Sequence, residues 1–213
     1  MKLSLSITLL AFSLTAWCAS PIILNGTAAT VGNRLVTIQD ARFYRALQRF
    51  REGESDVFRA EEGEELRRTV QKLVLDEMVF AEMKSFQFEA GNRAEAEKNL
   101  RAERSKGKSR EGVWKEFLLR FGKTEAVAVD RLHKTLQVDK FLQKKVETLT
   151  PIVTEAEAER YFQQNQSRFY GNTFDHLKPS IILRLKKERM QKGLEEWVKF
   201  LEDKYGVNNL LEG

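Results

Sequence analysis

Apolar residues along most of the chain recur every three or four positions, which is the period of an α-helix. The strongest case is the stretch 64–88, where they form two ridges instead of one. The ridges consist of Leu66, Val70, Val74 and Met78, and of Leu75, Val79, Met83 and Phe86. A helix that is apolar on more than one side is normally packed by several neighbours. The pattern therefore predicts a central helix over 64–88.

Signals for helix ends divide the rest of the chain into further helices. The segments 37–40 and 154–157 resemble capping boxes, in which a threonine side chain accepts a hydrogen bond from a backbone N–H of the first turn. Thr124 is a further N-cap candidate, and Gly122 and Gly206 are candidate helix stops. Helices are therefore predicted over 38–50, 93–104, 113–121, 125–149, 155–164 and 179–205.

Three short segments have extended patterns. The stretches 22–26 and 33–37 are separated by turn residues around Gly32, and 207–211 follows the last predicted helix. Strands this short need partners, so the last segment is expected to pair with the first two. The expected fold class is mainly α, a multi-helix domain with short N- and C-terminal β-strands that can pair.

The first residues have the organisation of a secretory signal peptide. Lys2 precedes an apolar run over 3–17, and the small residues at 18–20 suit a cleavage site. The run is shorter than the ~20 residues that span a bilayer. We expect a cleaved signal peptide over 1–20, a periplasmic location and no stable membrane insertion. Retention of Cys18 as a lipidated first residue is the alternative, which Trp17 disfavours because a small residue is preferred there.

Composition limits the remaining classes of protein. Cys18 is the only cysteine, so no disulfide framework is expected and stability must come from packing. The formal charge is +5, to which Lys2 contributes one. This mild excess is typical of a solvated helical surface, and a basic patch for acidic lipid or lipopolysaccharide is the alternative. Nucleic acid is not an expected partner of an exported chain.

Few residues support catalysis. The two histidines, His133 and His176, are far apart, and neither has the spacing of a metal-binding motif. The sequence lacks a G-x-S-x-G nucleophile elbow, a glycine-rich phosphate loop and an H-E-x-x-H motif. We expect no enzymatic activity, no metal and no cofactor.

Flexible and aromatic apolar residues are the candidates for a binding surface. Methionine and aromatic side chains adapt to varied apolar peptides, so some of them can line a groove for an extended chain. The candidate peptide-binding residues are Met78, Met83, Phe86, Trp114, Phe117 and Phe121. The alternative is that these side chains form an ordinary core, and the sequence leaves both open.

Four segments follow one another in a characteristic order: a turn and strand over 31–40, the helix segment 73–83, the capped helix entry over 153–162 and the closing helix over 174–206. In this order they resemble the SurA family of periplasmic chaperones. The resemblance covers nearly the whole chain after the signal peptide, although the motifs are degenerate. It implies a helical chaperone domain over 21–213, with an N-terminal helical core over 21–150 and closing helices and a C-terminal strand over 151–213.

The chain departs from the usual plan of that family at one place. Members usually carry one or two parvulin isomerase domains of roughly a hundred residues before the closing helix. Only 150–178 is available here, and it contains no parvulin-like glycine-rich segment. The resemblance therefore implies client binding without prolyl isomerase activity.

The expected function is that of a periplasmic holdase for unfolded outer-membrane or secreted proteins. An adaptor or assembly subunit that binds one folded envelope partner is the first alternative, and a divergent peptidyl-prolyl isomerase is the second. The expected partners are extended client polypeptides. The sequence does not determine the client or the oligomeric state.

Overall fold

The computed structural model describes residues 26–88 and 91–211. The predicted signal peptide, Cys18 and most of the first predicted strand lie outside this part of the chain. The described part is mainly helical with one small antiparallel sheet, which confirms the expected fold class.

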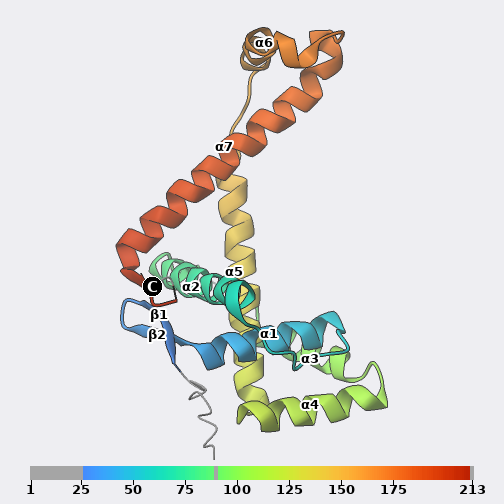
Figure 1. Cartoon of the computed structure of the whole chain (residues 1–213), viewed down its shortest axis with the longest axis vertical. Helices are drawn as coiled ribbons and strands as arrows, with labels where there is room; N and C mark the ends of the chain where they lie inside the picture. Colours follow the sequence, from blue (N-terminus) through green and yellow to red (C-terminus); the bar gives the residue numbers. More distant parts are fainter. Residues whose placement is uncertain (1–25, 89–90, 212–213) are drawn as a thin grey trace, which may run out of the picture.

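The helices form a compact base and a long arm (Figure 1). The base contains α1, α3, α4, the N-terminal half of α5 and the central helix α2, while the arm is formed by the rest of α5 and by α7, with α6 at the end far from the sheet. The helices are α1 (Ile38–Glu52), α2 (Gly63–Ser85), α3 (Arg93–Arg104), α4 (Lys108–Phe121), α5 (Glu125–Leu149), α6 (Glu155–Gln164) and α7 (Phe174–Tyr205), with a 3₁₀ turn over Gln166–Phe169.

The sheet joins the two ends of the domain. Its order is β2 (Arg34–Thr37), β1 (Thr27–Val31) and β3 (Val207–Asn209), and both pairings are antiparallel. The turn between β1 and β2 depends on Gly32, whose φ of 55° favours glycine. A Cβ at this position would lie 3.3 Å from the Tyr205 carbonyl oxygen, so the hairpin approaches the end of α7 closely.

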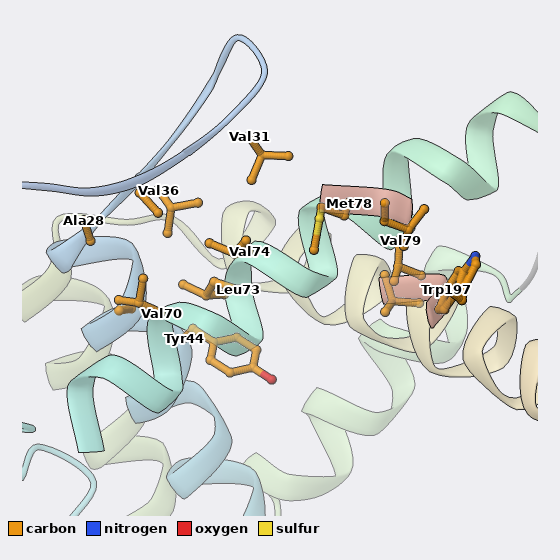
Figure 2. Packing of buried hydrophobic residues seen from close by; sticks show 14 residues of the cluster. Ala28, Val31, Val36, Tyr44, Val70, Leu73, Val74, Met78, Val79 and Trp197 are labelled. Atoms are coloured by element: carbon orange, nitrogen blue, oxygen red, sulfur yellow. The ribbon is translucent and has the colours of Figure 1, made fainter. Parts of the chain in front are cut away.

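The main core lies between this sheet, α2 and α7 (Figure 2). Val74, Met78 and Val79 of α2 share one buried cluster with sheet residues such as Val36, and with Trp197 of α7. The cluster combines residues from the two predicted segments, 21–150 and 151–213. Because α7 completes the core that the N-terminal half begins, the described residues at both ends of the chain contribute to one structural unit.

A second core fills the base between α1, α3, α4 and α5. Its largest residues are aromatic: Phe43 and Phe50 from α1 pack with Trp114 and Phe117 from α4. Leu132 of α5 belongs to the same cluster, so α5 contributes to the base before it enters the arm.

The starts of two predicted helices are wrong. α4 begins at Lys108, before the predicted start at 113. The last helix begins at Phe174, so that Pro179 lies inside it instead of in its first turn. Proline removes one N–H from the helix but leaves the others, and the helix continues through Pro179.

Candidate functional site

The six candidate peptide-binding residues do not lie on one surface. Met78 and Met83 are buried, and Met78 belongs to the core between α2 and the sheet. Trp114 and Phe117 are buried in the second core, and Phe121 packs against that core while partly exposed. Phe86, immediately after α2, is 69% exposed. The structure therefore does not bring these six side chains together in a groove.

The aromatic residues of α4 form a continuous stack inside the base. The Trp114 and Phe117 rings are stacked with centroids 5.1 Å apart, and the Phe117 ring lies 5.3 Å from that of Phe43. Aromatic pairs at this distance contribute to core packing. These rings can reach a bound peptide only if the base opens, and their peptide-binding role stays a prediction.

A different apolar surface is exposed along the arm. Leu183 and Leu201 of α7 are about five helical turns apart, so they lie on the same side of the helix. Leu201 is fully buried in the main core, whereas Leu183 is 69% exposed. The apolar stripe that holds α7 on the domain thus continues along the arm beyond the residues that cover it.

The end of α5 explains this exposure. Gly193 of α7 faces Leu149, the last residue of α5, and a Cβ at Gly193 would lie 3.6 Å from the Leu149 side chain. Beyond this crossing the chain leaves α5 and continues through 150–154 towards α6. Ile152 in that segment is 87% exposed. The arm therefore presents apolar side chains on α7 and on the connecting segment where no helix covers them.

Lysines flank the exposed part of the stripe. Lys186 and Lys187 follow Leu183 by three and four positions, which places them beside it on the helix surface. Neither lysine has an ion-pair partner among residues 26–88 and 91–211. We use the name arm surface for Ile152 of the connecting segment together with Leu183, Lys186 and Lys187 of α7; these side chains are apolar or cationic.

The opposite side of α7 holds the tip of the arm. Ile181 of α7 and Ala158 of α6 are buried there, and the Phe162 ring packs at 5.8 Å from that of Phe174. Glu157 of the α6 capping box also accepts a 2.7 Å hydrogen bond from Arg189.

This hydrogen bond lowers the pKa of Glu157 in the first turn of α6. The hydrogen bond from Arg189, helped by the backbone N–H of Thr154, lowers the pKa of Glu157 to about 2. Its carboxylate therefore stays charged in mildly acidic solution, and the capping box at the tip stays formed.

The base of the arm is fixed by a buried carboxylate. Glu82 of α2 accepts hydrogen bonds of 2.6 Å from the Lys204 ammonium and from the Tyr205 hydroxyl at the end of α7. Burial favours the neutral acid, but these bonds outweigh it and lower the pKa of Glu82. The charged carboxylate ties the last turn of α7 to α2.

Within the residues that the structure describes, no group of three or more potential metal ligands occurs. His133 has its Nε2 atom 3.5 Å from the Gly91 carbonyl oxygen, and His176 is exposed on α7.

One buried acid has an unusual environment. Burial raises the pKa of Asp76, although Lys72 and Arg131 lie against its carboxylate. Asp76 is almost fully buried and lies beside two cations. This arrangement is typical of charges that pair to stabilise the fold.

No helix in the described part of the chain is both long and apolar enough to cross a membrane. No family model, curated protein or solved structure matches the chain.

Sequence reasoning missed the arm surface, although one signal for it exists. The run 181–185 contains four apolar residues that point in different directions around a helix, which is more than contact with α6 alone requires. An amphipathic surface helix needs one apolar stripe, so the surplus at Leu183 indicates a second contact surface.

Proposed function

We propose that this protein is a SurA-like periplasmic holdase that binds unfolded outer-membrane or secreted proteins through the arm surface. The observation that carries the proposal is the continuation of the α7 stripe from buried Leu201 to exposed Leu183. Single exposed apolar side chains are ordinary, whereas an apolar stripe that continues beyond its buried part is typical of a contact surface, so the continuation of the stripe supports the proposal.

The arrangement suits transient binding of extended chains. The apolar side chains of the arm surface contact apolar residues of a client, and the lysines attract acidic residues between them. An open surface accepts chains of varied sequence because it does not impose the shape of a closed pocket. The predicted export signal supports the periplasmic location.

An adaptor that binds one folded envelope partner is the main alternative. It would use the same apolar stripe, but with one complementary surface instead of many sequences. The two proposals differ in the range of partners: a holdase suppresses the aggregation of several unrelated unfolded proteins, whereas an adaptor protects only one.

The test is an aggregation assay with two unrelated unfolded outer-membrane proteins and one unfolded non-membrane protein. We expect the purified chain to suppress the aggregation of all three. Leu183→Gln combined with Ile152→Gln should weaken suppression, because glutamine keeps the helix propensity at 183 but removes the apolar contact. Leu119→Gln is the matched control, since Leu119 is 83% exposed on α4, outside the arm.

Two results would contradict the proposal. Failure to suppress the aggregation of any of the three clients would contradict the holdase function. Equal loss of suppression in the arm variant and in the Leu119 variant would show that the arm surface is not the binding site. A proline-peptide assay addresses the isomerase alternative, for which catalysis above the slow uncatalysed exchange would be required.

A further inference from the structure

A pocket of about 400 Å³ lies in the base of the domain, away from the arm. Its walls are α1, the segment 57–61 and the last turn of α4. A volume of this size is within the range of small-molecule sites. Five arginines line it, with Glu61 as the only carboxylate: Arg42, Arg45, Arg49, Arg59 and Arg120.

Three of these arginines are neutralised by nearby acids. Glu61 lies 3.2 Å from Arg45 and 3.3 Å from Arg49, and Glu65 lies 3.1 Å from Arg49 and also pairs with Arg59. Glu61 and Arg49 are almost fully buried, so their ion pair is part of the structure of the base. This side of the pocket needs no ligand to balance its charge.

The other two arginines have no acid partner among the residues that the structure describes. Arg42 of α1 forms no ion pair in the described part of the chain, and its Nε atom is buried without a hydrogen-bond partner. Arg120 of α4 lies 4.9 Å above the Phe58 ring and likewise has no carboxylate within ion-pair distance among the described residues. A buried donor without a partner is costly, so an acceptor at this position would stabilise it.

The rest of the wall is apolar. Val57 is buried, while Phe58 and Phe121 are partly exposed and line the same pocket as Arg42 and Arg120. Free phosphate would leave these side chains without a contact. A ligand that combines an anionic group with an apolar body would satisfy both parts of the wall.

We propose that this pocket binds a small organic anion, a carboxylate or phosphate group on an apolar body, with the anionic group held between Arg42 and Arg120. Guanidinium groups donate paired hydrogen bonds to either kind of oxyanion. The apolar body packs on Phe58 and Phe121. The site is separate from the arm surface and does not depend on the proposed holdase function.

The test is calorimetric titration of the purified chain with phenyl phosphate and benzoate, compared with inorganic phosphate and neutral benzyl alcohol. We expect saturable binding of an aromatic anion and weaker binding of the latter two. Arg42→Gln and Arg120→Gln should each weaken binding by about tenfold or more, because each removes charge-assisted hydrogen bonds. Arg101→Gln is the control, since Arg101 is exposed on α3 and does not line the pocket.

The outcomes separate clearly. Absence of saturable binding by both aromatic anions, or binding that both pocket variants leave unchanged, would overturn the site. Equal affinity for inorganic phosphate would overturn the apolar part of the proposal, and equal affinity for benzyl alcohol the anionic part. Thermal unfolding of each variant shows whether it folds; if Arg42→Gln does not, Arg120→Gln decides the test because Arg120 is exposed.

Discussion

The Tyr205 hydroxyl donates a 2.6 Å hydrogen bond to the Glu82 carboxylate and so connects the last turn of α7 to the end of α2. Lys204 donates to the same oxygen. The two residues of α7 precede Gly206, where the helix ends and β3 begins. One buried carboxylate therefore fixes both the base of the arm and the start of the C-terminal strand.

This contact predicts a loss of stability in acid. The pKa of Glu82 is lowered in the folded state from an ordinary value of 4.5, so its contribution to the free energy of unfolding is fully present above pH 4.5. The contribution is lost as the pH falls through the lowered folded-state pKa. Glu82→Gln should cost about 1–3 kcal/mol at pH 7 and progressively less as the pH falls below 4.5. Urea unfolding over a series of pH values from 7 downwards measures this.

Glu188→Gln is the matched control for that experiment. Glu188 is exposed on α7, and within the described part of the chain its ion-pair partner is Arg184, one turn away. Its replacement should therefore change stability by less than about 0.5 kcal/mol. A pH-independent effect of Glu82→Gln would show that the carboxylate charge does not hold the arm.

Neighbouring residues of α7 provide a test of whether the chain ends form one unit. Leu201 is fully buried against the main core, and the adjacent Phe200 is largely exposed. Leu201→Ala should cost about 2–5 kcal/mol of unfolding free energy, because it leaves a cavity. Phe200→Ala should cost less than about 1 kcal/mol. Guanidinium midpoints measure both, and a similar small effect of the two would mean that α7 does not stabilise the N-terminal half.

Local signals in the sequence predicted four of the helix ends correctly. Thr37 and Thr154 form the expected capping boxes, and Gly122 and Gly206 end their helices in the left-handed conformation. These features depend on residues within one turn of each other, so neighbouring sequence determines them. Pro179 was placed in the first turn because proline is favoured there, whereas α7 tolerates the loss of one N–H inside the helix.

The candidate site depended on information that local sequence does not contain. The apolar stripe of α7 continues from Leu201 to Leu183, but only the end of α5 near Gly193 decides which part is covered. In the same way, nothing in the neighbouring sequence marks Arg49 and Glu61 as buried. They nevertheless form a buried ion pair, because the segment after α1 folds back onto that helix. Both outcomes follow from the positions of other elements.

Substitutions in α4 test whether its aromatic side chains belong to the core or to a client-binding surface. Phe117 is fully buried among aromatic rings, and Leu119 on the same helix is 83% exposed. Phe117→Ala should cost about 3–5 kcal/mol, while Leu119→Ala should cost less than about 1 kcal/mol. Denaturant midpoints and client affinity of the folded fraction are measured together. If folded Phe117→Ala protein binds the client more weakly and loses little stability, the result would support a client-binding role for α4.

Because of Pro179, we expect the tip of the arm to unfold locally more easily than the rest of the domain. Proline inside a helix lacks the N–H that would bond to the Asp175 carbonyl, and its ring crowds that carbonyl. Pro179→Ala should therefore stabilise the tip by about 1–2 kcal/mol, which is less than the full helix penalty because proline also restricts the unfolded chain. Amide hydrogen exchange should slow by roughly 5–30-fold in α6 and the first turns of α7.

The same measurement distinguishes a local effect from a global one. Amides of α2 lie in the main core and report the opening of the whole domain, so their exchange should change less than that of the tip. Pro151→Ala is the control, because Pro151 lies between α5 and α6 and breaks no helix there. Equal slowing in α2 and α6 would mean that the tip opens only with the rest of the domain. In that case the arm surface would be presented by a rigid arm, and client binding would not require any movement of α6.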